Sequence, residues 1–324
     1  MIRTAECVSP MHPDKMCDRI SDTLLDLHLR HDPYSRVAIE TAGGNGLVYI
    51  TGEVTSEYKV TQEEIENVVR EVTKDENIAV IININRQSPE IAQGVDTGGA
   101  GDQGIMTGYA CRENEQLVPQ EYFLARELNK SIFTKFPFDG KTQITLDRNR
   151  VRVVVSFQNA EREDLYEIVV EFFKHYPQYT LEQIHINPAG DWTIGGFTAD
   201  AGLTGRKLAV DNYGPRIPIG GGAFSGKDST KVDRSAAYMA RRIAVDLLEQ
   251  DESRNEVFVQ LAYAIGYDQP LQATAVIDGV EKPIKNLLEY DLSPSGIIDF
   301  LKLRLPQFAE TAEFGHMGNG FSWK

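Results

Sequence analysis

The sequence has 324 residues, of which 41% are hydrophobic and 25% charged, a composition typical of a globular protein of two or three domains. Its formal net charge of −15 argues against nucleic acid or an anionic membrane as a partner, because both would be repelled over most of the surface. The sequence has neither an apolar run of the ~18 residues that a membrane span needs nor a signal-peptide pattern. Cys7, Cys17 and Cys111 form no C-x-x-C pair and leave one cysteine over, so we expect reduced thiols and a cytoplasmic location.

The first third of the chain predicts a strand, a helix, a hairpin, a second helix and another strand. Pro13 suits the first position of the first helix, which places His12 and Asp14 at its N-terminus. Gly43-Gly44-Asn45-Gly46 is a strong turn signal between two β-rich runs. The predicted strands span 2–8, 36–41, 46–55 and 78–84, and the predicted helices span 13–31 and 62–74.

The same order recurs further along the chain. The second round has helices at 119–134 and 164–175 and strands at 143–146, 151–157 and 184–186; the third has helices from Asp233 and at 295–303 and strands at 257–265 and 272–277. The first helices of the rounds begin near residues 13, 119 and 233, which predicts a structural repeat. Antiparallel hairpins with two helices per unit imply an α+β fold whose helices cover one face of each sheet. We place the three α+β domains at 1–98, 99–193 and 194–324, with segments exchanged between them.

Three long polar, glycine-rich segments interrupt this order, at 87–104, 187–205 and 214–229. Loops of that length in a compact domain are usually functional. The stretch from Gly220 to Ser235, which begins within the third segment and runs into a predicted helix, carries Lys227 and Lys231. It has the composition of a phosphate-binding loop and is called the phosphate loop below. Between residues 206 and 242 there are eight cations and three acids, which indicates a polyanionic ligand. The alternative is a solvated glycine-rich turn with ordinary surface lysines.

The phosphate loop follows the Walker A pattern G-x-x-x-x-G-K-[ST] only until Asp228, which replaces the hydroxyl residue. It is therefore a phosphate loop of another kind. If the following helix began at Ser229, Lys231 and Asp233 would lie about 200° apart on it, so we place the helix start at Asp233. A second pattern, G-x-G-x-x-G at 99–104, does not indicate a dinucleotide fold, because no predicted strand comes directly before it.

Several single residues have both a functional and a structural interpretation. Asp14 and Asp233 together suit magnesium on a polyphosphate, although each alone is more typical of an aspartate at a helix start. His12 at a helix start can donate to an oxygen that gains charge as a bond breaks. Trp192 is either a core aromatic or a stacking surface for a base.

Five ordered motifs together closely resemble the S-adenosylmethionine synthetase family. They are Met11-His12-Pro13-Asp14-Lys15, the run from Gln87 to Asp96, the run from Gly99 to Gly104, Gly202-Leu203-Thr204-Gly205-Arg206-Lys207, and the run from Gly220 to Ser235. The resemblance extends from about Thr4 to Trp323. It implies three α+β domains about a pseudo-threefold axis, and a homodimer or dimer of dimers with active sites shared between subunits. The implied reaction joins methionine sulfur to C5′ of ATP, releases triphosphate, and cleaves it to pyrophosphate and phosphate.

The resemblance also implies residue roles. His12 would assist the leaving oxygen, and Lys141, Arg206, Lys207, Lys227 and Lys231 would hold the triphosphate. Asp14 and Asp233 would bind two Mg²⁺ ions, and Glu40 would bind K⁺. Glu53, Gln87 and Asp200 would form the methionine site, and Asp102 and Trp192 would contact adenosine.

The sequence departs from the family pattern at several places. Met11 replaces a usual Gly, Asn159 a common His and Ser229 a Pro, while Trp192 replaces a common Phe. The segment between Gln93 and Asp102, part of the family's mobile gate, is shorter than usual and lacks its acidic stretch. Two other functions remain open from the sequence: an unrelated phosphate-loop ATPase, which would release ADP, and a non-catalytic binding member of the family. Retention of every leaving-group cation favours the enzyme.

Overall fold

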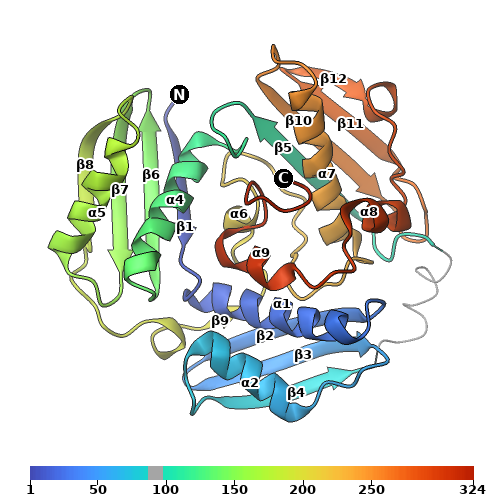
Figure 1. The fold of residues 1–324 in the computed structure, drawn as a ribbon, viewed down its shortest axis with the longest axis horizontal. Helices are drawn as coiled ribbons and strands as arrows, with labels where there is room; N and C mark the ends of the chain where they lie inside the picture. The colour runs from blue at the N-terminus through green and yellow to red at the C-terminus, as the bar shows by residue number, and fades with distance from the viewer. Residues whose placement is uncertain (87–97) are drawn as a thin grey trace.

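In the computed structural model, which describes residues 1–86 and 98–324, the chain forms three four-stranded sheets with helices between them (Figure 1). The strand orders are β4-β3-β2-β9, β8-β7-β6-β1 and β12-β11-β10-β5. The strands are β1 (Arg3–Val8), β2 (Arg36–Gly44), β3 (Leu47–Thr55), β4 (Ala79–Asn85), β5 (Gly104–Cys111), β6 (Gly140–Asp147), β7 (Arg150–Phe157), β8 (Thr180–Ile186), β9 (Gly202–Leu203), β10 (Glu256–Tyr263), β11 (Gln272–Ile277) and β12 (Val280–Pro283). The helices are α1 (Pro13–His31), α2 (Gln62–Thr73), α4 (Gln120–Lys135), α5 (Arg162–Lys174), α6 (Leu208–Asp211), α7 (Val232–Glu249), α8 (Pro294–Leu301) and α9 (Phe308–Phe314), with short 3-10 turns η1 (Gly196–Thr198) and η2 (Ile284–Asn286).

The three predicted hairpins form the centres of the three sheets. β2–β3, β6–β7 and β10–β11 are antiparallel pairs, and α1, α4 and α7 pack on the sheet faces that point toward the middle of the molecule (Figure 1). The predicted α+β class with three similar units is confirmed. Among the described residues, no helix corresponding to α1, α4 or α7 covers the outer face of a sheet (Figure 1).

The turns and helix starts follow from local sequence. Asn45 and Gly46 connect β2 to β3 with φ of 55° and 74°, as a two-residue hairpin turn requires. Arg148 has φ of 57° in the turn between β6 and β7. The first helix of the third round is predicted to begin at Asp233, and α7 begins at Val232 with Lys231 as its N-cap, so Lys227 and Lys231 both precede the helix.

Each sheet also contains a strand from another part of the chain. β1 pairs with β6, β5 with β10 and β9 with β2, all antiparallel. The sequence did not predict β5 or β9, and β1 was predicted without a partner. The third unit also departs from the predicted order, because its outer strand β12 comes before α8 and is antiparallel, whereas β4 and β8 are parallel to their neighbours. The domain bounds at 98 and 193 stay a prediction.

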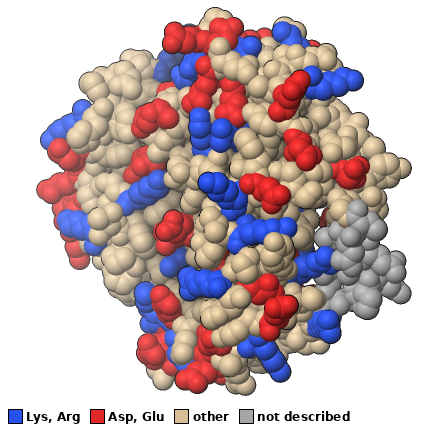
Figure 2. Space-filling model, turned by 45° about the vertical axis from the view of Figure 1, so that its right-hand side comes forward, with Lys and Arg blue, Asp and Glu red and all other residues tan. Residues whose placement is uncertain are grey.

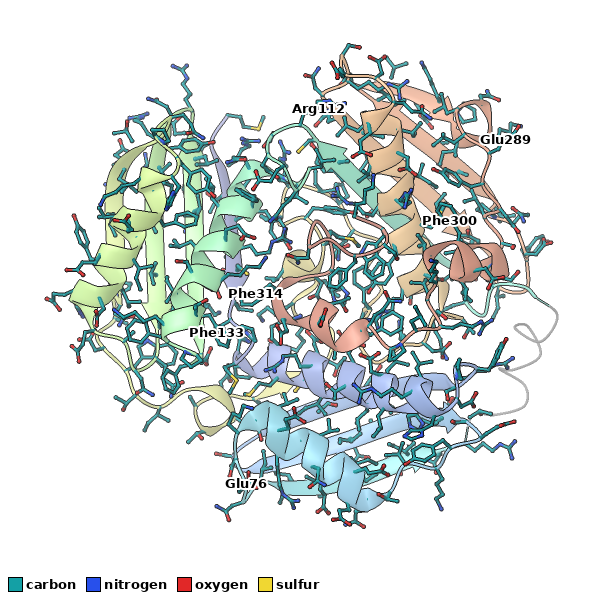
Figure 3. All side chains as sticks on the ribbon, in the orientation of Figure 1. Glu76, Arg112, Phe133, Glu289, Phe300 and Phe314 are labelled. Carbon is teal, nitrogen blue, oxygen red and sulfur yellow. The ribbon has the colours of Figure 1, made fainter. Side chains whose placement is uncertain are left out.

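The C-terminal segment fills the centre between the three units (Figure 1). Phe314 of α9 packs edge-to-face on Phe133 of α4, with ring centroids 5.8 Å apart, and Figure 3 shows the two labelled rings next to each other. Trp323 is fully buried, stacks on Tyr238 of α7 at 3.8 Å and donates from its indole N–H to the His316 carbonyl. The three units therefore share one core.

The surface carries both signs of charge. In Figure 2, Lys and Arg side chains lie across the middle of the visible face, and acidic side chains gather near its top and bottom. Among residues 1–86 and 98–324, the structure contains no helix with the length and apolar character that crossing a lipid bilayer requires.

Candidate functional site

Two loops that carry cations lie along the same edge of β2. In β9, Leu203 pairs with Ala42, and Arg206 and Lys207 follow three and four residues later in the chain. Further along the edge, Lys227 forms an isolated antiparallel bridge with Ala38. Since strands rise about 3.3 Å per residue, the two attachment points are about 13 Å apart. The Gly202–Lys207 loop and the phosphate loop therefore face the same region.

Asp14, in the first turn of α1, holds the Gly202–Lys207 loop. Its carboxylate accepts from the Leu203 N–H at 2.9 Å and from Lys207 Nζ at 2.5 Å, and Arg206 Nε lies 3.5 Å away. Burial raises the pKa of Asp14, but the hydrogen bonds from Lys207 and Leu203 outweigh it and hold the pKa below its usual value. Asp14 is therefore ionised at neutral pH and surrounded by cations.

His12 caps the N-terminus of α1 in its neutral form. Its Nδ1 accepts from the Asp14 N–H at 3.2 Å, so the ring proton is on Nε2. Burial, together with the ammonium groups of Lys207 and Lys141, lowers the pKa of His12 to about 4. The imidazole can therefore donate one hydrogen bond from Nε2 at neutral pH.

Asp233, in the first turn of α7, forms an ion pair with a lysine of the phosphate loop. Lys227 Nζ lies 2.7 Å from Asp233 Oδ2. Gly222 and Gly104 pack against the same carboxylate: a Cβ on Gly222 would lie 2.4 Å from Asp233 Cγ, and one on Gly104 3.3 Å from Oδ1. A side chain at Gly222 would therefore clash with Asp233, and one at Gly104 would make a tight contact with its carboxylate.

Asp228, the residue that breaks the Walker A pattern, anchors the phosphate loop. Its carboxylate accepts from the Val37 N–H of β2 at 2.6 Å and from the Thr230 N–H at 2.8 Å, and it also binds Lys231 Nζ. It is 1% exposed. A serine or threonine hydroxyl could not hold all three donors at once, so the carboxylate serves the loop's attachment to the sheet.

Glu40 and Glu53 lie on the outer face of the β4-β3-β2-β9 sheet. Glu53 is directly opposite Ala38, whose other neighbour is Lys227, and Glu40 is two residues further along β2 on the same face. This arrangement brings the predicted methionine and potassium residues to the side of the sheet on which Lys227 lies.

The remaining predicted residues come from the second and third sheets and their loops. Lys141 is exposed on β6. The charges of Lys141 and Asp200 both act on His12, which places both residues near the start of α1. Asp200 also lines a cavity of about 530 Å³ with Phe197, Gly43 and Tyr49. Asp102 and Trp192 form no hydrogen bond or ion pair with the two loops within the described residues; Asp102 bonds to the Gln103 N–H, and Trp192 lies beside Gly195.

Two sequence expectations concern residues near the gap in the described chain. Gln87 and residues 93–97 of the shortened gate lie outside the described residues. The G-x-G-x-x-G pattern at 99–104 leads directly into strand β5, whereas the dinucleotide-binding pattern opens a helix.

Family models for the N-terminal, central and C-terminal domains of S-adenosylmethionine synthetase match residues 1–89, 97–192 and 194–324. The chain belongs to the S-adenosylmethionine synthetase family. S-adenosylmethionine synthase 2 of Rhodospirillum rubrum is 40% identical over 99% of this chain and 94% of its own length. S-adenosylmethionine synthase of Salinibacter ruber is 41% identical with the same coverage. The solved structure of an unusual S-adenosylmethionine synthetase from Campylobacter jejuni has a TM-score of 0.89 and 32% identity, covering 99% of this chain and 96% of that one.

Members of the S-adenosylmethionine synthetase family need metal ions. In residues 1–86 and 98–324, no three histidine, cysteine, aspartate or glutamate side chains are arranged to hold one. Asp14 and Asp233 nevertheless fit magnesium, which binds through one or two carboxylates together with phosphate oxygens and water. Each carboxylate already binds a lysine that a phosphate could take over. These residues fit ions that enter with the polyphosphate.

Sequence reasoning missed the residues that hold the two loops in this family member. They are Asp18 and Asp22 of α1, both buried, together with Lys15, Ser21 and Arg234. A signal was present, because Asp14, Asp18, Asp22 and Asp26 recur every four residues on a helix whose other side is apolar.

Proposed function

We propose that this protein is an S-adenosylmethionine synthetase that transfers the adenosyl group of ATP to the sulfur of L-methionine. The sulfur displaces triphosphate at C5′, and the triphosphate is then hydrolysed to pyrophosphate and phosphate. The observation that carries the proposal is the placement of two cation-bearing loops, each with an aspartate at a helix start, along one edge of β2. Family membership agrees with it.

The chemistry of this reaction explains the excess of cations. A neutral thioether is a weak nucleophile, so the rate depends on in-line placement and on stabilising the charge that leaves with the triphosphate. Arg206, Lys207 and Lys141 would bind one end of the triphosphate and Lys227 and Lys231 the other. His12, neutral and with its proton on Nε2, would donate to the oxygen that leaves C5′.

The metal roles are assigned to the carboxylates of the same loops. Asp14 and Asp233 would hold two Mg²⁺ ions on the polyphosphate, and Glu40 would bind K⁺ on the outer face of the sheet. The bound ions would supply positive charge that stabilises the departing phosphate oxygens. Lys207 and Lys227 each pair with one of these aspartates and would turn to phosphate when substrate binds.

The remaining roles concern substrate recognition. Glu53, Gln87 and Asp200 would bind methionine, and Asp102 and Trp192 would contact adenosine. Glu53 and Asp200 are supported by position, since Glu53 shares a sheet face with Lys227 and the charge of Asp200 reaches His12. Trp192 is half-buried, and its ring would give adenine a stacking surface.

A homodimer or dimer of dimers would complete the site. Ile81, Tyr49, Ala42 and Leu203 lie directly opposite one another across four strands on the outer sheet face that also carries Glu40 and Glu53. Ile81 is 50% exposed, Leu203 40% and Tyr49 36%, an apolar row that a second copy would cover. The three free, buried cysteines suit a reducing cytoplasm.

The test is incubation with ATP, L-methionine, Mg²⁺ and K⁺, followed by detection of the products. We expect S-adenosylmethionine, pyrophosphate and phosphate, with no product when Mg²⁺ is omitted. Release of ADP without a sulfonium product would show a phosphate-loop ATPase instead.

Lys227→Met tests the leaving-group role. Removing this ammonium should lower kcat by about 10²-fold or more, as the loss of a preorganised charge partner usually does, while the KM for methionine stays within about threefold. Unchanged kcat in this variant would remove Lys227 from the mechanism.

A further inference from the structure

The four aspartates of α1 each hold a different segment of the chain. Asp14, Asp18, Asp22 and Asp26 are at most 3% exposed. Residues four apart on a helix are about 6 Å apart along the axis and differ by about 40° around it, so the four form one continuous stripe. Asp14 binds the Gly202–Lys207 loop, as described above.

Asp18 holds the same loop one turn further along α1. Its Oδ1 accepts from the Gly205 N–H at 2.8 Å, and Gly205 directly precedes Arg206. Its Oδ2 accepts from Lys15 Nζ at 3.1 Å, and Lys15 also donates to Asp211 at 2.7 Å. Lys15 is fully buried, so this network fixes both the start of the Arg206–Lys207 pair and the helix α6 that follows it.

Asp22 holds the phosphate loop. Its Oδ1 accepts from the Gly226 N–H at 2.8 Å, next to Lys227. Both carboxylate oxygens bind the buried Arg234 of α7, at 2.6 and 2.9 Å. Arg234 in turn donates to the carbonyls of Phe224 and Lys227, so Asp22 fixes the loop on both sides of the lysine.

Ser21 lies between these two contacts on the helix and adds a link to the sheet. Its hydroxyl is 2.9 Å from both the Thr204 and the Thr41 hydroxyls. Thr204 belongs to the Gly202–Lys207 loop and Thr41 to β2, so helix, loop and strand are tied together at this point. The spacing agrees as well: Asp14 and Asp22 are about 12 Å apart along the helix, close to the separation of the two loops on β2.

Asp26 ends the stripe in a different place. Its carboxylate accepts from the N–H groups of Gln307, Phe308 and Ala309 at 2.9 to 3.0 Å, which satisfies the start of α9. None of these residues belongs to either cation-bearing loop. Asp26 therefore has the same burial, helix and chemistry as Asp18 and Asp22, but a purely structural partner.

We propose that Asp18 and Asp22 are positioning residues that set the Arg206–Lys207 loop and the Lys227 loop at a fixed separation for the leaving triphosphate. This inference rests on the proposed function. Neither side chain contacts the substrate in the proposed role. Each acts through a backbone N–H, that of Gly205 or Gly226, directly before a cationic residue.

The test compares Asp18→Ala and Asp22→Ala with Asp26→Ala in the full chain. We expect kcat for S-adenosylmethionine formation to fall by about 10- to 100-fold in the first two, since small displacements of catalytic groups have effects of that size. The KM for methionine should stay within about threefold of wild type, because the two loops bind the leaving triphosphate and not methionine. Asp26→Ala should lower the melting temperature, yet kcat should stay within about threefold of wild type.

Asparagine variants and a second ligand keep the test decisive if an alanine variant does not fold. Asp18→Asn and Asp22→Asn keep an oxygen for the Gly205 and Gly226 N–H groups, so each should keep kcat within about tenfold of wild type. Binding of inorganic triphosphate with Mg²⁺, measured by calorimetry, should weaken in the Asp18 and Asp22 variants and stay unchanged in Asp26→Ala.

Two results would overturn the positioning role. One is wild-type kcat in folded Asp18→Ala and Asp22→Ala; the other is a loss of kcat in all three alanine variants that follows their loss of stability. Failure of the proposed function is a separate outcome, because wild-type protein would then form no S-adenosylmethionine, while triphosphate binding would still rank the variants.

Discussion

Replacement of Gly226 by alanine should detach the phosphate loop from the sheet. Gly226 has φ of 81°, and a Cβ there would lie 1.8 Å from the Ile39 carbonyl oxygen of β2. Because that atom belongs to the backbone, the loop itself must move. The move breaks the hydrogen bond from Ile39 N–H to the Gly226 carbonyl, 3.0 Å, and that from Gly226 N–H to Asp22, 2.8 Å.

Gly221→Ala in the same loop is the matched control. Gly221 has φ of 98°, but nothing lies within 4 Å of its added Cβ. Both variants carry the left-handed strain of about 1–2 kcal/mol. Gly226→Ala also leaves two buried polar groups unpaired at about 1–3 kcal/mol each, so it should be about 2–6 kcal/mol less stable than Gly221→Ala.

The assay combines urea unfolding with the rate of S-adenosylmethionine formation. Gly226→Ala should show the lower unfolding midpoint and a kcat reduced by about 10²-fold, since Lys227 moves with the loop. Gly221→Ala should be affected less in both. Equal midpoints and equal kcat values for the two variants would refute the argument from close backbone approach.

Two further predictions concern pH and assembly. Burial lowers the pKa of His28 to about 4, against the smaller opposing effects of Asp32 and Glu64 and with a further lowering by His31. As pH falls, His28 is therefore protonated in the unfolded chain at a higher pH than in the folded protein. The stability that the folded protein gains from the neutral, buried His28 is fully present above the unfolded pKa and is lost as pH falls toward the folded pKa. Relative to His28→Leu, wild type should lose about 2 kcal/mol of unfolding free energy between pH 7 and pH 5. Because both proteins contain Asp18 and Asp26, whose pKa values burial raises, their contributions cancel in the comparison. A difference in unfolding free energy between the two proteins that is the same at pH 7 and pH 5 would contradict the prediction. Ile81→Glu should lower the sedimentation coefficient to that of a monomer and reduce activity, because a symmetric interface would bury the new charge twice. Tyr166→Glu, at an exposed aromatic residue of α5, should change neither.

Most of the predicted site residues belong to short sequence motifs. His12 and Asp14 occupy the start of α1, and Lys227 and Lys231 precede α7, because caps and helix starts depend on neighbouring residues. Asp228 shows the limit of such reasoning. The sequence marked it as the residue that breaks the Walker A pattern, but its bond to Val37 of β2 depends on a segment 191 residues away.

By itself, the sequence determined the elements whose signals are local: the three hairpins, the helices that cover them and the order in which they recur. Turn geometry and amphipathic spacing require only adjacent residues, so these features can be read without a fold. The tertiary structure alone decided that β1, β5 and β9 join sheets built from distant segments, and that the aspartates of α1 hold the two cation-bearing loops. Such partners are set by burial and hydrogen bonding summed over the whole core, and no local pattern in the sequence encodes that sum.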